Sequence, residues 1–286
     1  MTYATLAEAK QEIKAENTVN ATEDARVYTY LRTVSSRLDL EFSQRRPMFM
    51  PWIEAREIRA TSANINSVDN VLYLGQNLLA LSGASIGGQS LTVGSAVDVW
   101  PPLASPIRSL RLLNVSDRWY NYCSSNGAPL FGTITGVWGF HRDYAHAWLA
   151  VDALAAAITT TTATTFTVAD VDGTDPYNRT PRISAGNLLK IDDEFLEVVA
   201  TDTATNTVTV IRGANGSTAA THVISSVVST WQVEEPVKRA CARQASFLYA
   251  RRGSYENATV DGIGAVSFPA DWLGEVKRIL HEYAYD

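Results

Sequence analysis

Histidines and clustered carboxylates are the residues of this chain best suited to acid–base or metal chemistry. His141 and His146 lie on either side of Asp143, an arrangement that would suit a general base or a metal-binding pair. The two histidines are five residues apart and no Cys or Glu lies at a helical offset from them, so the spacing matches no common ligand pattern. We therefore expect a turn at the surface or at an interface. An enzyme acting through His141 or His146 is the weakest of the alternatives.

A group of aspartates resembles a cation-binding loop in spacing only. Asp170, Asp172 and Asp175 surround Gly173 as in a calcium loop, but the twelfth position is Pro181, where the pattern requires Glu. An exposed turn rich in Asp is the better interpretation, because Asp side chains stabilise turns through their own backbone.

A second acidic group lies about twenty residues further on. Asp192, Asp193, Glu194 and Glu197 could pair as acid and base, but they alternate on a predicted hairpin with no nearby His or aromatic cleft. We expect the tip of this hairpin to be solvated. His222 is expected to be a local hydrogen-bonding residue rather than a metal ligand.

Established catalytic motifs are absent from the sequence. It contains no G-x-S-x-G, no Walker A motif, no dinucleotide fingerprint and no zinc-ligand spacing. We therefore expect a protein that is not an enzyme and that needs no cofactor and no metal. Cys123 and Cys241 lie far apart in the chain and are expected to be reduced thiols, one of them buried.

The composition is that of a folded chain with a slight acidic excess. Of its 286 residues, 46% are hydrophobic and 19% charged, which excludes wholesale disorder. The net charge of −6 gives no general attraction for nucleic acid or for an anionic membrane. Five of the 24 basic residues are Lys and the rest are Arg, the side chain better suited to bidentate contacts between protein surfaces.

Nothing in the sequence predicts export or membrane anchoring. The N-terminus has neither the basic nor the apolar region of a secretory signal. The most apolar run, residues 147–158, is interrupted by Asp152 and is too short to span a bilayer. We expect synthesis in the cytoplasm and no membrane partner.

Helical signals occur at the beginning of the chain. Thr5 and Glu8 fit a capping box for a helix ending near Glu16, and Thr22 is placed to cap a second helix. Apolar residues at spacings of four and three form one stripe on that second helix: Val27, Leu31, Val34, Leu38 and Phe42.

Helical signals return near the end. Pro236 follows two Glu residues at a helix start, and Gly253 terminates the helix. Pro269 and Asp271 open a last helix. Its expected apolar stripe is Trp272, Val276, Ile279 and Tyr283.

The segments between these helices have the pattern of strands. Short apolar runs separated by Gly, Ser and Pro follow one another from residue 48 to residue 140. From residue 151 to residue 230 several more short strands are predicted without any helical period. This segment, the β module, carries nine acidic and four basic residues, a net charge of −5, whereas the rest of the chain has a net charge of −1.

These elements predict an α+β protein. We expect a helical bundle formed by the N- and C-terminal helices, with a β-rich middle and an inserted all-β module. The expected domains are a discontinuous core, residues 1–150 with 231–286, and the β module, residues 151–230.

The order of these elements resembles the head–tail connector, or adaptor, proteins of tailed bacteriophages. Those chains begin with a pair of capped helices similar to residues 5–42, then continue through a strand and loops. The later segments that carry the resemblance are residues 106–113 (PIRSLRLL), 134–140 (ITGVWGF) and 236–252 (PVKRACARQASFLYARR). A last short helix closes the chain. The resemblance covers most of residues 1–150 and 231–286, and its specificity lies in the order of the segments.

The β module is a departure from that family. It is similar to a small module that recurs in phage structural proteins, with a strand pair like residues 189–199 and an R-G-x-N-G-[ST] stretch, here residues 212–222 (RGANGSTAATH).

The resemblance implies a structural virion protein at the head–tail junction. Such a protein forms a ring, usually dodecameric, beneath the portal and extends the DNA channel towards the tail. Its implied partners are other copies of itself, the portal protein and a neck, tail-terminator or stopper protein. Double-stranded DNA would pass through without sequence-specific contact, which the acidic balance suits.

Three sets of residues are candidates for contacts. Basic pairs at two predicted helix ends, Arg45 with Arg46 and Arg251 with Arg252, could touch DNA phosphates, but ion pairing between subunits or with the helix dipole is the better interpretation. Aromatic residues near the C-terminus are expected to anchor the core or an interface rather than stack on carbohydrate: Trp272, Tyr283 and Tyr285. Outer contacts of the β module are expected at Asp192, Asp193, Arg212 and His222.

A second function remains open from the sequence. The chain could be a baseplate- or fibre-associated protein whose β module binds a glycan or another virion protein. Monomers or trimers that bind glycan would favour this alternative over the ring.

Overall fold

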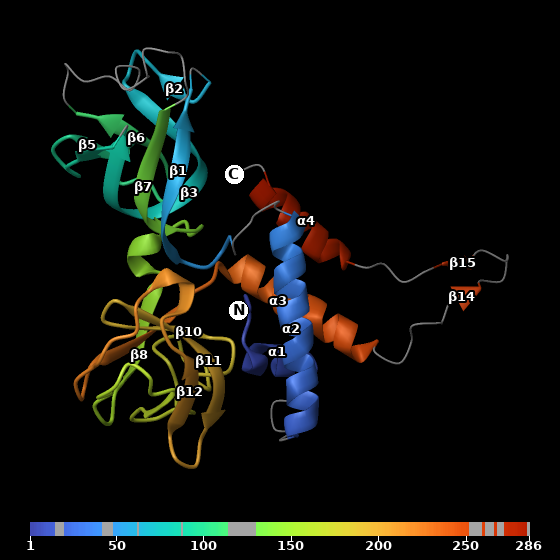
Figure 1. The fold of residues 1–286 in the computed structure, drawn as a ribbon. Coiled ribbons are helices and arrows are strands. Elements are labelled where there is room, and N and C mark those ends of the chain that lie inside the picture. The colour runs from blue at the N-terminus through green and yellow to red at the C-terminus, as the bar shows by residue number, and fades with distance from the viewer. Residues whose placement is uncertain are drawn as a thin grey trace. The chain divides into compact units, whose positions relative to one another are not determined.

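The computed structural model of the chain describes residues 1–14, 20–41, 48–61, 63–86, 88–113, 130–251, 259–260, 266–267 and 272–284. The chain divides into two compact units (Figure 1). Unit 1 comprises Met1–Pro47, Trp148–Ala214 and Thr218–Asp286, and unit 2 comprises Met48–Ala147 and Asn215–Ser217.

Unit 2 contains an antiparallel sheet whose main path runs β1-β7-β3-β6-β5, with β2 and β4 also pairing with β3. Its strands are β1 Trp52–Ala60, β2 Ile65–Asn66, β3 Val71–Ile86, β4 Gln89–Leu91, β5 Val97–Trp100, β6 Ile107–Leu112 and β7 Leu130–Trp138. The apolar runs around residues 71–74 and 78–81, predicted as separate segments, belong to the single long strand β3. β3 lies between β7 and β6 and pairs with both, with register shifts in each pairing.

The core of unit 2 depends on a close approach of β3 and β7. Trp138 is fully buried, and its indole Nε1 donates to the carbonyl of Glu54, 3.0 Å away. At Gly136 a Cβ atom would lie 2.1 Å from the carbonyl oxygen of Ala80 and 2.8 Å from Leu78 Cδ1. Glycine is therefore required here by space rather than by backbone conformation.

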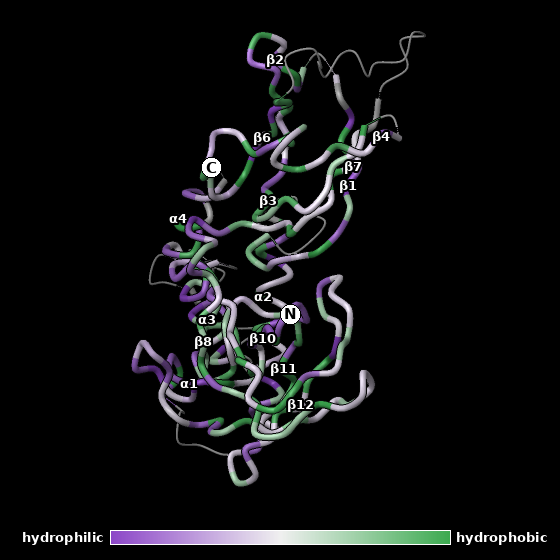
Figure 2. Tube along the Cα trace, turned by 90° about the vertical axis from the view of Figure 1, so that its left-hand side faces the viewer, coloured by the Kyte–Doolittle hydropathy of each residue, from purple (hydrophilic) through white to green (hydrophobic). Residues whose placement is uncertain are grey.

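Unit 1 contains a second antiparallel sheet, of order β8-β13-β10-β11-β12-β9. Its strands are β8 Trp148–Ala153, β9 Thr165–Thr167, β10 Leu188–Ile191, β11 Glu194–Asp202, β12 Thr207–Ile211 and β13 Val227–Trp231. Leu189, Leu196 and Val208 are fully buried in its core. Hydrophobic positions recur along the strands of both sheets, whereas hydrophilic stretches are frequent along the helices (Figure 2).

The helices of unit 1 are α1 Leu6–Glu12, α2 Ala21–Glu41, α3 Glu235–Ala250 and α4 Gly274–Ala284. The predicted capping box of α1 is present, with Thr5 and Glu8 bonded reciprocally. The cap of α2 differs from the prediction: Asn20 Oδ1, rather than Thr22, accepts the backbone N–H groups of Thr22 and Glu23. Among the described helices, none is long and apolar enough to cross a membrane.

Helices from the two ends of the chain pack on one another. Ser35 of α2 lies against the buried Cys241 of α3, with 3.3 Å between Oγ and Sγ. Ser246 of α3 donates to the carbonyl of Ala9 in α1, and Arg243 of α3 pairs with Glu275 of α4. The described residues of the two predicted apolar stripes, those of α2 and α4, are all buried, and Phe42 lies outside the described residues.

The predicted fold class is wrong. The described part of the chain is β-rich, with two antiparallel sheets, and the terminal helices do not make it a helical bundle. The physical reason is length: α1 has only 7 residues and α4 only 11, whereas β3 alone has 16. Glycine and serine residues interrupt the apolar runs of β3, so the sequence pattern indicates several short segments instead of one long strand. A short hairpin, β14 Thr259–Val260 with β15 Val266–Ser267, follows α3 and precedes α4 in the chain.

Candidate functional site: a buried ionic cluster in the β module

The densest group of charged side chains in the described residues surrounds Glu194, the first residue of β11. Its side chain is completely buried. The tight turn before it places Asp192 in the left-handed region, at φ 51°, which lets β10 turn directly into β11. The turn therefore delivers a carboxylate into the module interior, where the sequence predicted a solvated tip.

The Glu194 carboxylate accepts five hydrogen bonds. Oε1 accepts from Arg212 Nε at 2.6 Å and from the backbone N–H of Gly213 at 3.1 Å. Oε2 accepts from Arg212 Nη2 at 2.7 Å, from the backbone N–H of Ala220 at 3.0 Å and from His222 Nε2 at 2.8 Å. All the donors come from one loop, residues 212–222. The loop is therefore wrapped around a single anion.

This environment fixes the charge of Glu194. Burial alone would raise its pKa, but the hydrogen bonds from Arg212, Ala220, His222 and Gly213 outweigh burial and lower the pKa to about 2. The carboxylate is ionised at neutral pH and its lone pairs are occupied. It therefore has no capacity left to act as a general base.

His222 is held between two carboxylates. Its Nδ1 lies 2.7 Å from Asp192 Oδ2, and its Nε2 lies 2.8 Å from Glu194 Oε2. Each ring nitrogen therefore has a carboxylate oxygen at hydrogen-bond distance. Its backbone exchanges two hydrogen bonds with Ile158, both 2.9 Å, which fixes the position of the ring.

Arg212 completes the cluster and links it to a third segment. Its Nη1 donates to the carbonyls of Thr160, at 3.3 Å, and Ala163, at 2.9 Å, and its Nη2 also donates to the carbonyl of Ala220. The side chains of Glu194, Arg212, His222 and Asp192 thus join the segment 158–163, the β10–β11 turn and the loop 212–222. The arrangement stabilises the module and leaves no group poised for catalysis.

The loop 212–222 also contributes Asn215–Ser217 to unit 2. Asn215 is in the left-handed conformation and its Nδ2 donates to the carbonyl of Pro51 at 2.8 Å. A Cβ on Gly216 would lie 2.0 Å from the carbonyl oxygen of Ile53. The Asn-Gly pair of the sequence motif is therefore required by backbone conformation and by space.

Two aspartates of the aspartate-rich segment pair with arginines. Asp175 is buried and accepts from Arg179, whose Nη2 lies 2.7 Å from its carboxylate, and Asp170 pairs with Arg182 at 3.0 Å. Burial would raise the pKa of Asp175, but the hydrogen bonds from Arg179 and Tyr177 lower it. Among the described residues, no three His, Cys, Asp or Glu side chains are placed to hold a metal ion.

Of the four candidate residues of the β module, two have buried side chains and two are exposed. Arg212 and His222 are enclosed in the cluster, with side chains 6% and 1% exposed, whereas the side chain of Asp192 is 65% exposed. Asp193 is exposed.

The sequence predicted no His near the hairpin carboxylates, which is wrong, because His222 lies 2.7 Å from Asp192 and 2.8 Å from Glu194. It also predicted Arg212 and His222 at the outer surface, whereas both side chains are buried against Glu194. The signal that could have paired them is that Arg212 and His222 are the only basic side chains of the loop 212–222, whereas the hairpin turn at residues 192–194 is entirely acidic.

The candidates near the C-terminus lie mostly in the helix packing. Trp272 and Tyr283 are 7% and 2% exposed. The guanidinium of Arg37 lies over the Trp272 ring at 4.8 Å. Arg251 is exposed at the end of α3, over Phe247. Four candidates lie outside the described residues: Arg45, Arg46, Arg252 and Tyr285.

The histidines considered first for chemistry form an exposed turn. His146 Nδ1 lies 2.8 Å from Asp143 Oδ2, and the backbone N–H of Asp143 donates to His141 Nδ1 at 3.0 Å. The side chains of His146 and Asp143 are 80% and 61% exposed, so neither is shielded from water as a catalytic pair would be.

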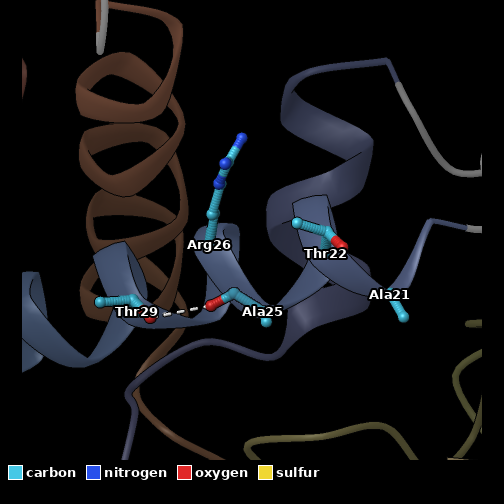
Figure 3. A pocket seen from close by; sticks show the side chains of 5 residues that line it. All are labelled: Ala21, Thr22, Ala25, Arg26 and Thr29. Carbon is cyan, nitrogen blue, oxygen red and sulfur yellow. Dashed lines mark hydrogen bonds between the residues drawn. The ribbon is translucent and has the colours of Figure 1, made fainter.

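A hollow of about 520 Å³ lies along the first turns of α2 (Figure 3). It is lined by Ala21, Thr22, Ala25, Arg26 and Thr29. Thr29 donates to the carbonyl of Ala25, and Arg26 pairs with Glu23 at 2.6 Å, so the lining offers no free acid or base.

Comparison of the sequence with protein-family models and with curated proteins gave no match.

Proposed function

We propose that this chain is a structural protein of a tailed-bacteriophage virion, a head–tail adaptor that assembles into a dodecameric ring beneath the portal. The ring extends the DNA channel to the neck or tail, where a tail-terminator or stopper protein binds. The chain performs no reaction and needs no cofactor. It is made in the host cytoplasm and resides at the head–tail junction.

The observation that carries this proposal is the packing of α1 and α2 on α3. Ser35 and Cys241 are in contact although they are 206 residues apart in the chain. Ala9 and Ser246, which are 237 residues apart, are also in contact. The resemblance to adaptor proteins requires an N-terminal helix pair to meet an alanine-rich helix from the end of the chain. This packing supports that arrangement despite the predominance of strands.

The β module gives a second line of support. A module that recurs in different structural proteins must be stabilised by its own residues. Here the loop 212–222, on which the resemblance of the module rests, donates all five hydrogen bonds to Glu194 of the same module. Hydrogen bonds between residues of the same module are expected of an insertion whose outer surface binds a partner.

The charge distribution suits a DNA channel that does not grip its cargo. The chain carries 30 acidic and 24 basic residues, and DNA binding by proteins depends on neutralising phosphates with Lys and Arg. A neutral or acidic lining lets the duplex slide.

One observation favours the alternative of a baseplate- or fibre-associated binding module. The β module exposes branched apolar side chains, including Val223 at 72% and Ile224 at 59%. Such exposure is typical of a surface that another molecule covers. In the adaptor proposal that molecule is another virion subunit.

The test is the mass of the purified chain, measured by light scattering after gel filtration, alone and with the portal protein of the same genome. A ring has a mass that is a multiple of 31.2 kDa, and its symmetry is visible by electron microscopy. A cyclic species in either condition supports the adaptor. A monomer or trimer that ignores the portal rejects it, and binding of glycans or tail proteins by the β module is then measured.

The variant Arg251→Glu sharpens this test. Arg251 is an exposed candidate for ion pairing between subunits, and Arg32, an exposed arginine of α2, provides the matched control Arg32→Glu. Loss of the ring in the first variant alone assigns the end of α3 to an interface. If both variants have the same mass in solution, Arg251 is not part of the interface. The measured mass of the wild-type chain then still decides whether a ring forms.

A further inference from the structure

Two segments of the β module contain no acidic residue, no Lys and no Arg: residues 153–169 and 213–233. The two segments adjoin: the N–H of Leu154 donates to the carbonyl of Ser226, and Ile158 and His222 exchange hydrogen bonds. Arg212 and Asp192 of the ionic cluster contact them at Ala163 and His222, and the rest of the two segments contributes only uncharged residues.

Apolar side chains are exposed on these two segments. We call the region that they form the neutral surface, and its exposed apolar members are Ala155, Ala156, Ala157, Val223, Ile224 and Val227. Depletion of charge combined with exposed apolar area distinguishes the centres of protein interfaces from ordinary surface. No aromatic ring is exposed among these members, so the neutral surface lacks a stacking platform for sugar.

The neutral surface includes a hollow of about 320 Å³. Ala156 and Ala157 line it together with Phe166 and the side chains of Thr165, Thr167 and Thr207. An apolar cavity of about 150 Å³ can hold a benzene molecule, so this hollow has room for one branched apolar side chain.

Unit 2 exposes a side chain of that kind. Leu103 is 98% exposed, and its φ of 64° lies in the left-handed region, which a bulky residue rarely adopts. The loop that carries it, residues 101–106, has no charge and contains three prolines. Ser105 anchors the loop: its Oγ donates to the carbonyl of His141 at 2.9 Å and accepts from the backbone N–H of Tyr144 at 3.2 Å.

The backbone strain at Leu103 costs free energy, and its exposed side chain gains no hydrophobic stabilisation unless a partner covers it. Strained backbone conformations tend to persist where they serve a function. Proline rings restrict the loop before any contact forms, so less conformational entropy is lost on docking. The loop thus has the properties of a preformed apolar anchor.

Charge favours a second copy as the partner, in a head-to-tail arrangement. Two β modules facing each other would bring together two net charges of −5. Residues 48–147 carry six acidic and six basic residues, so unit 2 approaches the module without such repulsion. A contact between different surfaces of identical chains, repeated, generates a closed ring when the rotation closes.

We propose that the Leu103 loop of one copy docks in the hollow of the neutral surface of the next copy. This contact rests on the proposed function, because it is the subunit interface of that ring. Leu103 is its central anchor, and Ala156 and Ala157, which line the hollow, pack against it.

Paired cysteines test the contact directly. In a Cys123→Ser background, Leu103→Cys is combined with Ala156→Cys and treated with a short bis-maleimide. A head-to-tail contact links each copy to the next, so denaturing gels show a ladder extending beyond the dimer. The control pairs Leu103→Cys with Thr33→Cys, an exposed position of α2, and is expected to give no ladder.

A substitution tests the anchor itself. Leu103→Asp is expected to raise the concentration needed for half-assembly about tenfold or more, as removal of an interface anchor does. The matched control is Leu113→Asp, because Leu113 is also an exposed leucine of unit 2 and lies outside the loop. Unchanged thermal unfolding of both variants shows that folding is not the cause.

The outcomes separate this contact from the ring itself. A ring without the Leu103–Ala156 ladder overturns the contact and leaves the proposed function in place. Linkage of Ala156→Cys to the portal, instead of to another copy, assigns the neutral surface to the portal and also overturns it. With no cyclic species alone or with portal, the proposed function fails and this subunit contact fails with it.

Discussion

His222 Nε2 lies 2.8 Å from Oε2 of Glu194, in the interior of the β module. The two residues are 28 positions apart, and both side chains are buried. Their contact shows how the motif of residues 212–222 acts: its side chains and backbone N–H groups form hydrogen bonds with one buried carboxylate. A sequence signature that could suggest chemistry is explained here by the stability of the module.

Replacing Glu194 with Gln should destabilise the chain by about 3 kcal/mol, because breaking a buried ion pair leaves Arg212 without its counter-ion. The amide keeps the shape of the side chain but offers one acceptor in place of two charged oxygens. Urea unfolding followed by circular dichroism measures the loss. Asp193→Asn, at an exposed position of the same turn, is the control and should change the free energy of unfolding by less than about 0.5 kcal/mol. Equal effects of the two substitutions would contradict the cluster.

Acid should remove the same stabilisation. The pKa of Glu194 is about 2 in the folded chain, against 4.5 for the free side chain. Because its pKa is lower in the folded chain, the ionised Glu194 contributes fully to the free energy of unfolding above pH 4.5. This contribution is lost as the pH falls towards 2. From the shift, that contribution is about 3 kcal/mol. Thermal unfolding between pH 7 and pH 2 should therefore show wild type and Glu194→Gln converging at low pH. A constant difference across this range would contradict the lowered pKa.

Gly136→Ala should destabilise unit 2 by about 3 kcal/mol, as overpacking in a core does. The new Cβ would lie 2.1 Å from the carbonyl oxygen of Ala80, a backbone atom held in the sheet. Gly83→Ala is the matched control, since its nearest neighbour would be 3.6 Å away, an ordinary contact. Tryptophan fluorescence reports the loss, because Trp138 lies in the same core. The prediction is wrong if the two variants unfold at the same denaturant concentration.

Periodicity along the chain predicted the buried stripe of α2 and the strand pattern of residues 48–140 and 151–230, because these depend on neighbouring residues. It could not predict that Glu194 is buried, since its ligands come from the loop 212–222, more than fifteen residues away. The same limit explains the fold class. Whether short apolar runs join into β3 depends on pairing with β6 and β7, and these contacts are invisible to local pattern.

The packing of α2 on α3 should protect Cys241 from thiol reagents. Complete burial raises the pKa of this thiol to about 12, against 9.0 for a free cysteine, although its hydrogen bond with Ser35 lowers the pKa. A raised pKa stabilises the folded chain below pH 9 and no longer does so as the pH rises towards 12. In a Cys123→Ser background, maleimide labelling at pH 8 should be slow in the native chain and fast after unfolding in urea. Leu103→Cys, at a position that is 98% exposed, gives the fast native rate for comparison. Rapid native labelling of Cys241 would mean that the helices from the two chain ends separate readily, which would remove the observation on which the adaptor proposal depends.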